Sequence, residues 1–294
     1  MPFSLIPDSP VPMKTPRILT LALLAALPLV AAAADFKESL GIQLYSLRNQ
    51  FRSGTSGALD LVKGYGVTEV ETYNIAGVTP AQLSEELKAR GIKAVAAHMG
   101  YADFQKDINA VIANAKTLGV QTVYIPILPG RDLKDADAHR IAADFNTFGA
   151  ALKAAGLKFG FHTHGAEFLP SAAGNGETLF DIIVRETKAD LVTFEMDVFW
   201  TYQAGQNPAA LLAKYPDRWS SIHIKDLRKD GPIGLANRTI PSDNVAVGTG
   251  QINWPEILAA AQKIGVKHYF IEDETPAPLE AIPASLTYLR GLKL

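Results

Sequence analysis

Short apolar runs alternate with amphipathic helical segments along most of this chain, and this alternation restricts the fold more than any other feature. Several runs are nearly continuous in apolar residues, which is typical of strands buried on both faces of a parallel sheet. The eight expected strands are residues 41–45, 68–72, 94–98, 122–127, 158–162, 191–197, 220–225 and 268–272. Strands that alternate strictly with helices predict parallel βαβ units.

Helical segments separate the expected strands. Thr79 and Pro80 form a cap and first turn for one helix, which ends at Gly91. Apolar residues recur at helical spacing in four further segments, residues 104–118, 136–155, 253–264 and 279–292. Eight strand–helix units predict an α/β fold of one domain, the closed (β/α)8 TIM barrel, which takes about 250 residues. An open doubly wound sheet is the alternative, but the residues after the first strand, QLYSLR (43–48), form no glycine-rich phosphate loop.

The N-terminal residues 1–34 have the pattern of a secretory signal peptide. Lys14 and Arg17 precede a mostly apolar stretch of 13 residues, 18–30, and alanines occupy positions 32–34. A membrane-spanning helix needs about 20 apolar residues, so an uncleaved anchor is the less favoured alternative. We therefore expect an exported protein, periplasmic or extracellular, whose barrel comprises residues 35–294.

Charge and cysteine content exclude several classes of protein. The chain of 294 residues has no cysteine, which rules out disulfides, thiolate metal sites and a cysteine nucleophile. Its formal charge is −2, and removal of residues 1–34, with their net charge of +1, leaves −3. Neither value gives the basic surface that nucleic-acid binding requires. A multi-metal phosphodiesterase on the same barrel would need such a surface and more histidines.

Active sites of such barrels lie at the carboxyl ends of the strands. Four of the six histidines stand there, while His139 and His268 lie elsewhere and have a simpler surface or packing interpretation. The polar residues at or just beyond the expected strand ends are Gln43, Tyr45, Glu71, Tyr73, His98, Tyr124, His162, His164, Glu167, Glu195, Asp197, His223, Lys225, Asp226, Glu272, Asp273 and Glu274.

Carboxylates and imidazoles from separate strands can surround one divalent metal ion. Asp197, His223 and Glu272 form the best set, completed by Glu167, His162 or His164. Mixed oxygen and nitrogen ligands suit Mn, Co, Zn, Fe or Mg. Taken singly, each residue has a plainer interpretation, since an Asp at a strand end often caps the next helix and a His often packs in the core.

Five strings carry a resemblance to a known family: FHTHGAEF (161–168), MDVFW (196–200), HIKD (223–226), VGTGQINW (247–254) and FIEDE (270–274). Their order resembles the xylose isomerase-like TIM barrel superfamily, in particular its sugar phosphate isomerase/epimerase group and the exported members of that group. The resemblance covers about 250 residues. It implies that Glu167, Asp197, His223 and Glu272 bind the metal, with His162 or His164 as possible replacements for Glu167.

The resemblance also implies the chemistry, which is proton removal beside a carbonyl to give an enediolate. The implied catalytic residues are Glu167, Glu272, His164 and Lys225. The implied substrate-binding residues are Gln43, Tyr45, Glu71, His98, His162, Trp200 and Arg228. The polar stretch 228–250 is expected to fold over the site and shape its specificity.

An export signal and the lack of a phosphate clamp favour a non-phosphorylated sugar or keto-sugar as substrate. The expected activity is a divalent-metal-dependent sugar isomerase or epimerase. One alternative is a lyase or hydratase that eliminates across a 3-keto-glycoside, because it begins with the same proton abstraction. Another is a carbohydrate-binding barrel without catalysis. We expect a small-molecule partner, no nucleic acid and no membrane after signal cleavage, and a homodimer remains open.

Overall fold

The computed structural model describes residues 1–4, 35–236 and 241–294. The chain divides into two units, Met1–Ala32 and Ala33–Leu294, and the second contains every helix and strand described. The predicted signal sequence lies outside the described residues, apart from residues 1–4. Within the described part, no helix is both long and apolar enough to cross a bilayer.

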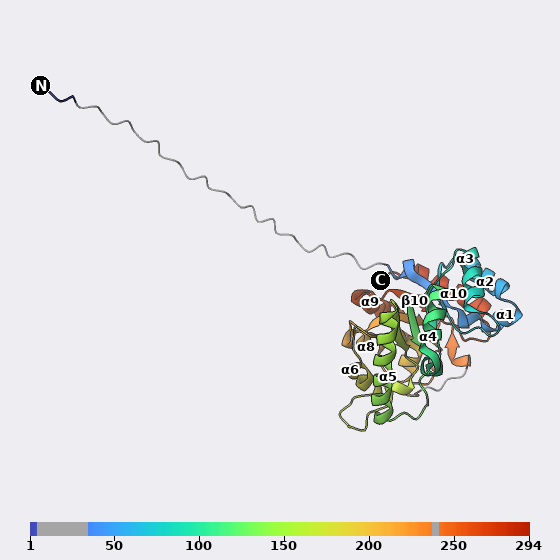
Figure 1. The fold of residues 1–294 in the computed structure, drawn as a ribbon. Helices are drawn as coiled ribbons and strands as arrows, with labels where there is room; N and C mark the ends of the chain where they lie inside the picture. Colours follow the sequence, from blue (N-terminus) through green and yellow to red (C-terminus); the bar gives the residue numbers. More distant parts are fainter. Residues whose placement is uncertain (5–34, 237–240) are drawn as a thin grey trace. The chain divides into compact units, whose positions relative to one another are not determined.

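Eight parallel strands close into a barrel (Figure 1). They are β1 (Leu40–Gln43), β2 (Glu69–Thr72), β3 (Lys93–His98), β4 (Thr122–Ile125), β5 (Lys158–His162), β6 (Val192–Asp197), β7 (Trp219–Ile224) and β10 (His268–Ile271). Around the barrel they follow the order β1-β10-β7-β6-β5-β4-β3-β2. The predicted single-domain (β/α)8 TIM barrel is therefore confirmed. A two-stranded antiparallel sheet, β8 (Asp226–Leu227) and β9 (Asn244–Val245), follows β7.

Helices flank the barrel and connect its strands (Figure 1). The described helices are α1 (Arg48–Ser53), α2 (Thr55–Gly64), α3 (Pro80–Ala89), α4 (Tyr101–Leu118), α5 (Asp135–Ala154), α6 (Leu179–Glu186), α7 (Val198–Gln203), α8 (Pro208–Lys214), α9 (Trp254–Ile264) and α10 (Pro278–Gly291). The start of α3 is set as the sequence predicts, because Thr79 and Gln82 form a reciprocal capping box and Pro80 occupies the first turn.

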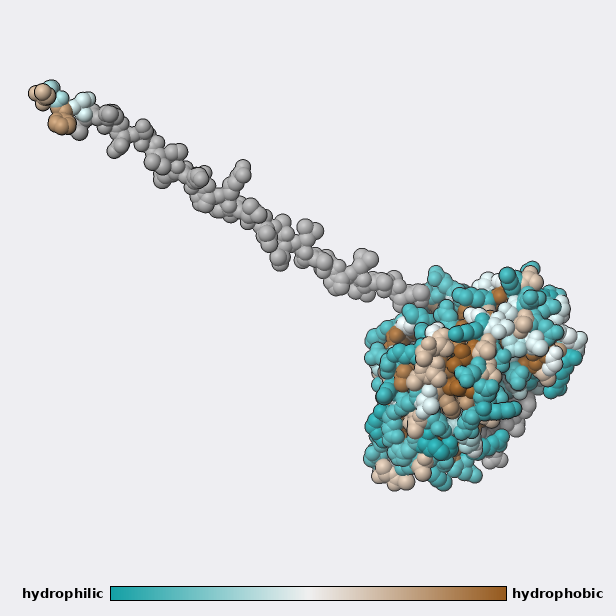
Figure 2. Space-filling model, in the orientation of Figure 1, coloured by the Kyte–Doolittle hydropathy of each residue, from teal (hydrophilic) through white to brown (hydrophobic). Residues whose placement is uncertain are grey.

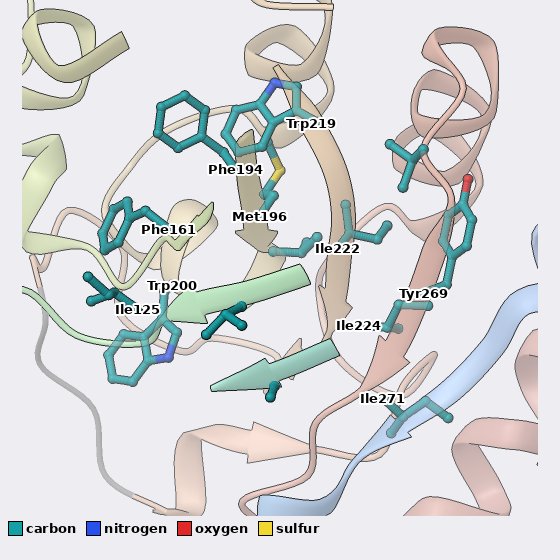
Figure 3. Packing of buried hydrophobic residues seen from close by; sticks show 14 of the residues in the cluster. Ile125, Phe161, Phe194, Met196, Trp200, Trp219, Ile222, Ile224, Tyr269 and Ile271 are labelled. Atoms are coloured by element: carbon teal, nitrogen blue, oxygen red, sulfur yellow. The ribbon is translucent and has the colours of Figure 1, made fainter. Parts of the chain in front are cut away.

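Alternate residues of each strand face opposite sides of the barrel wall. Those facing the helices are large and apolar, for example Phe161, Phe194, Ile222 and Ile271, and all of these are fully buried (Figure 3). The surface seen in Figure 2 is mostly hydrophilic, with brown confined to scattered patches. Apolar packing between strands and helices therefore holds the barrel closed, while the interior combines a small apolar cluster that includes Tyr124 and Phe270 with polar groups.

Two register shifts between paired strands change which side chains point into the barrel. In β7 the register against β6 shifts at Ser220, so that Asp197 lies opposite His223. In β3 the register against β2 shifts at Val95. Such bulges often turn side chains toward an active site. Here the shift in β7 sets an aspartate and a histidine side by side at the carboxyl end of the barrel.

Close packing inside the barrel requires glycine at position 160. A Cβ added to Gly160 on β5 would overlap the ring of Tyr124. We expect Gly160→Ala to lower the free energy of unfolding by about 1–3 kcal/mol, as overpacked cores do. Gly57→Ala is the matched control, since open space surrounds that position in α2, and it should stabilise by roughly 0.5–1 kcal/mol. Urea unfolding of both variants checks this, and equal effects would contradict it.

Candidate active site

The polar side chains at the strand ends meet inside the barrel. His223 Nε2 on β7 lies 2.6 Å from Glu71 Oε2 on β2. His98 Nε2 on β3 lies 2.9 Å from Glu195 Oε2 on β6. Neither pair of strands is adjacent in the sheet, so these contacts run across the barrel interior. The four side chains are almost completely buried.

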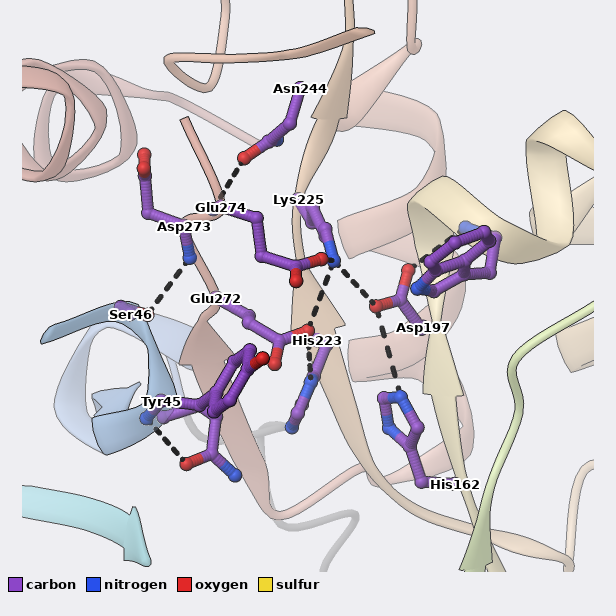
Figure 4. A network of polar contacts seen from close by, with 12 residues as sticks. Tyr45, Ser46, His162, Asp197, His223, Lys225, Asn244, Glu272, Asp273 and Glu274 are labelled. Carbon is purple, nitrogen blue, oxygen red and sulfur yellow. Dashed lines mark hydrogen bonds and ion pairs between the residues drawn. The ribbon is translucent and has the colours of Figure 1, made fainter. Parts of the chain in front are cut away.

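Four residues could hold one metal ion. His162, Asp197, His223 and Glu272 each offer a ligand atom, and these atoms all lie within 4.8 Å of one another (Figure 4). They come from the ends of β5, β6, β7 and β10. Asp197, His223 and Glu272 are three of the four ligands that the family resemblance implies. For the fourth ligand the sequence offers Glu167, His162 or His164, and the residue in this group is His162.

The spacing and bonding of this group fit a metal ion. His162 Nε2 lies 3.9 Å from Asp197 Oδ2, and His223 Nδ1 lies 3.4 Å from Glu272 Oε2. Ligand atoms bound about 2.1 Å from one ion lie roughly 3.0–3.4 Å or more apart, so these spacings exceed a good hydrogen bond but suit shared coordination. Asp197 Oδ2 is buried without a hydrogen-bond partner. An orphaned carboxylate oxygen of this kind is what a cation would satisfy.

The electrostatic surroundings keep one ligand histidine neutral. Burial and the neighbouring His223 together lower the pKa of His162 to about 4, although the hydrogen bond with Glu195 opposes the shift. A neutral imidazole is the form that binds a metal. Burial also raises the pKa of Asp197 to about 7, although Lys225 opposes the rise. The raised pKa means that the surrounding side chains stabilise the ionised form of Asp197 poorly. A bound divalent ion would supply the positive charge that stabilises it.

Lys225 stands at the upper edge of the group as a buried cation. Its ammonium contacts Glu274 and lies 3.3 Å from Glu272 Oε2 and 4.0 Å from Asp197 Oδ2 (Figure 4). It also sits over the ring of Trp200. Burial lowers the pKa of Lys225, but the three carboxylates outweigh it and leave the pKa raised. The side chain is therefore suited to donate hydrogen bonds and to neutralise charge, and not to act as a base.

A second polar layer lies beneath the first. Glu195 Oε2 approaches His98 Nε2, His162 Nδ1 and His223 Nε2 at 2.9, 3.1 and 3.1 Å. Burial lowers the pKa of His98, but Glu71 and Glu195 overcome this and raise it to about 9. His98 is therefore an imidazolium that balances part of the charge of these two buried carboxylates.

A cavity of about 360 Å³ opens above the metal group, a volume typical of small-molecule sites. His98, His162 and Glu272 line its inner end, together with His164 and Glu274. Its walls are aromatic and apolar: Tyr45, Tyr73, Pro126, Ile127 and Trp200. Flat aromatic walls and clustered polar groups suit a sugar ring with hydroxyls on its edge.

Two residues implied by the resemblance lie away from this cavity. Glu167 Oε1 accepts the backbone N–H groups of His164 and Gly165 at 2.6 and 3.1 Å, so its carboxylate is turned into its own loop. Burial raises the pKa of Glu167 to about 7. Arg228 Nε donates to Asp243 Oδ1 at 2.9 Å, and its side chain is not part of the cavity lining. The geometry thus does not support Glu167 as a ligand or Arg228 as a substrate contact.

The other implied residues lie in or directly under the cavity. His164 stacks on Trp200 with ring centroids 4.1 Å apart, and both line the cavity. Tyr45 lines it as well. Gln43 lies one layer lower, where its Nε2 donates to Glu71 Oε2 at 2.7 Å. Gln43 and Glu71 therefore support the site and do not face the cavity.

The stretch 228–250 does not cover the cavity in its described part. None of its described residues lines the cavity, and residues 237–240 of the expected lid lie outside the described residues. Its link to the site is Asn244, whose Oδ1 accepts the backbone N–H of Glu274 at 2.7 Å. Asp226 anchors the following turn by accepting the N–H groups of Gly248 and Gly250. The last residue of the HIKD string is therefore structural.

Glu195 is the central residue that the expected site did not include. It stands at a strand end in the sequence, two positions before Asp197, and therefore on the same face of β6. That spacing is the signal that could have placed it in the site. The sequence does not show which residues Glu195 contacts, because His98, His162 and His223 lie on three other strands.

Comparisons with known proteins agree with this architecture. The chain belongs to the xylose isomerase-like TIM barrel family, whose model matches residues 59–292. No curated protein matches the chain in sequence.

Solved structures share the fold at low sequence identity. A sugar phosphate isomerase/epimerase from Parabacteroides distasonis is 23% identical with a TM-score of 0.71, over 86% of this chain and 96% of that one. The IOLI protein with a bound zinc atom is 16% identical with a TM-score of 0.62, over 85% and 94%. The probable 3-DHS dehydratase AsbF from Bacillus anthracis is 14% identical with a TM-score of 0.64, over 87% and 100%. At these identities the likeness concerns the fold.

Proposed function

We propose that the protein is a divalent-metal-dependent isomerase or epimerase of a non-phosphorylated sugar or keto-sugar. The observation that carries this proposal is the buried group of His162, Asp197, His223 and Glu272 at the inner end of a sugar-sized cavity. The family, with isomerase and epimerase structures among its relatives, supports the reaction class. The zinc-bound relative supports a metal site in such a barrel.

The roles of the side chains follow from their positions. A bound divalent ion supplies positive charge to the substrate oxygens on which negative charge develops. The ammonium of Lys225 stays charged and donates hydrogen bonds to Glu272 and Glu274, two carboxylates that line the cavity. His164 and Glu274 line the cavity from different strand ends and are our candidates for moving the proton beside the carbonyl. Trp200 holds the sugar ring against its indole face.

One observation favours elimination from a keto-glycoside as the second candidate function. A cavity of about 370 Å³ between α3 and α4 adjoins the first and shares Tyr73, Asn74 and His98 with it. Such space would accept the leaving group of a glycoside. A dehydratase among the structural relatives supports elimination on this fold. Proton abstraction beside the carbonyl begins both reactions.

We also propose that the protein is exported and acts on a free small molecule. The signal pattern of residues 1–34 supports export, and export in turn favours a substrate without phosphate. Among the residues that the structure describes, neither lysine nor arginine lines the cavity, which agrees with an uncharged sugar. A formal charge near zero supports the absence of a nucleic-acid partner.

Deuterium exchange tests the proposed function. Keto-sugars and 3-keto-glycosides are incubated with the metal-loaded protein in deuterated water and recovered for mass spectrometry and NMR. We expect deuterium at the carbon beside the carbonyl, because enolisation exchanges that proton with solvent. Protein stripped with a chelator should exchange no faster than buffer, and added metal should restore the rate.

The products separate the candidate functions. An inverted or isomerised sugar supports the main proposal, and an alkene with a released aglycone supports elimination. Sugar binding by calorimetry without any exchange, across keto-sugars and glycosides, would overturn both and leave a carbohydrate-binding barrel.

A further inference from the structure

Two of the candidate ligands are imidazoles that each face two layers. His162 turns Nε2 toward Asp197 in the upper group and Nδ1 toward Glu195 below, at 3.9 and 3.1 Å. His223 turns Nδ1 toward Glu272 above and Nε2 toward Glu71 and Glu195 below, at 3.4, 2.6 and 3.1 Å. In each ring, one nitrogen therefore faces the candidate metal ligands and the other faces the buried carboxylates beneath them.

The distances differ between the layers. In the lower layer they lie between 2.6 and 3.1 Å, the range of direct hydrogen bonds. In the upper layer they are 3.4 and 3.9 Å, too long for strong hydrogen bonds and suited to ligands around one ion. Although His98, His162, Glu195 and His223 are also close enough together to bind a metal, their close contacts are those of donors with acceptors.

We propose that Glu195 is a positioning residue for the metal centre. Its carboxylate accepts the lower N–H of His162 and lies 3.1 Å from Nε2 of His223, whose N–H donates to Glu71. These negative charges keep the lower nitrogens protonated, which fixes both tautomers and directs the upper lone pairs at the ion. A carboxylate beneath a ligand imidazole also raises the basicity of that ligand. This inference rests on the metal site of the proposed function.

The remaining contacts of Glu195 explain how it is held there. Its Oε1 accepts from Ser221 Oγ at 2.6 Å, and its Oε2 is shared with His98. Glu71 is fixed in turn by Gln43 Nε2 at 2.7 Å. The lower layer thus combines two carboxylates with protonated His98, and each carboxylate has a donor besides the ligand histidines. Of the two carboxylates in this layer, Glu195 is the one that lies close to both candidate ligand imidazoles.

Metal affinity of a conservative variant tests the proposal. Glu195→Gln keeps the size and one acceptor oxygen but removes the charge and the second acceptor. We expect its affinity for Zn²⁺ or Co²⁺ to fall about 10–100-fold, as for other residues behind metal ligands. The d–d absorption band of the Co²⁺-loaded protein should also shift, because the ligand field of the two imidazoles changes. Both readouts are independent of catalysis.

Glu69→Gln is the matched control. Glu69 Oε2 lies 3.0 Å from His268 Nδ1, the same pair of chemical groups at the start of β2 and β10, at the opposite end of the strands from the site. Its metal affinity and Co²⁺ spectrum should equal those of the wild type. Thermal melting of both variants checks folding.

The outcomes separate this inference from the proposed function. A wild-type protein that binds no divalent ion would overturn the metal site itself. A wild type that binds one ion, with Glu195→Gln equal to it in affinity and Co²⁺ spectrum, would overturn only the positioning role. A stoichiometry of two ions, of which Glu195→Gln loses one entirely, would overturn it too, because Glu195 would then be a ligand.

Discussion

Changing Asp197 to asparagine should abolish metal binding and activity while the barrel stays folded. Asp197 Oδ1 accepts the backbone N–H of Trp200 at 2.9 Å and caps α7, and an asparagine carbonyl oxygen can keep this bond. The orphaned Oδ2 becomes an amide nitrogen, which does not ligate a cation. We expect a loss of affinity beyond the roughly 10–100-fold caused by residues behind the ligands. Calorimetric metal titration and circular dichroism measure the two effects.

The same variant should change how the metal-free protein responds to pH. Burial raises the pKa of Asp197 from 3.8 to about 7, so the folded state holds this proton more tightly than the unfolded chain does. Its contribution to stability is full below about pH 4 and is lost as the pH rises toward 7. Wild type should therefore lose stability over this range relative to Asp197→Asn. Parallel stability curves for the two proteins would contradict the assignment.

Removing the charge of Lys225 should strongly destabilise the metal-free protein. In Lys225→Met the carboxylates of Asp197, Glu272 and Glu274 lose the ammonium that lies among them. Breaking a buried ion pair from one side typically costs about 3–5 kcal/mol. The Tm without metal should fall accordingly, and activity should be lost because the ammonium that holds Glu272 and Glu274 in place at the cavity is gone.

Divalent metal should rescue much of this loss. An ion bound by His162, Asp197, His223 and Glu272 supplies positive charge to the same carboxylates, so metal should raise the Tm of Lys225→Met by more than that of the wild type. Lys153→Met is the control, because Lys153 forms an exposed pair with Asp190 and its loss should cost little. An equal metal-induced rise in Tm for Lys225→Met and wild type would contradict this account.

The sequence predicts the barrel well because the fold depends on local patterns. The segment 158–162 coincides with β5, and residues 220–225 differ from β7 by one residue at each end. The capping pair of α3 is likewise readable from neighbouring residues. Hydrophobic alternation and helix caps depend on residues close together in the sequence, so the positions of strands and helices can be predicted from it.

The site is less predictable, because its geometry depends on contacts between distant strands. Glu167 follows His162 by five positions, but a short 3-10 turn, Ala166–Phe168, folds its carboxylate back onto backbone amides. Ser220 has no pairing partner on β6, and this shifts which side chains of β7 point into the barrel. The hydrophobic pattern of the sequence does not indicate such a shift. Glu195 acquires its role only when β3, β5 and β7 surround it.

Anomalous X-ray diffraction from crystals grown with Zn²⁺ locates the ion directly. The metal centre predicts one strong peak, within about 2.3 Å of His162 Nε2, Asp197 Oδ2, His223 Nδ1 and Glu272 Oε2. Data collected on both sides of the zinc absorption edge identify the element. A peak beside Glu167, or no ordered zinc among these four side chains at saturating concentration, would contradict the proposed centre.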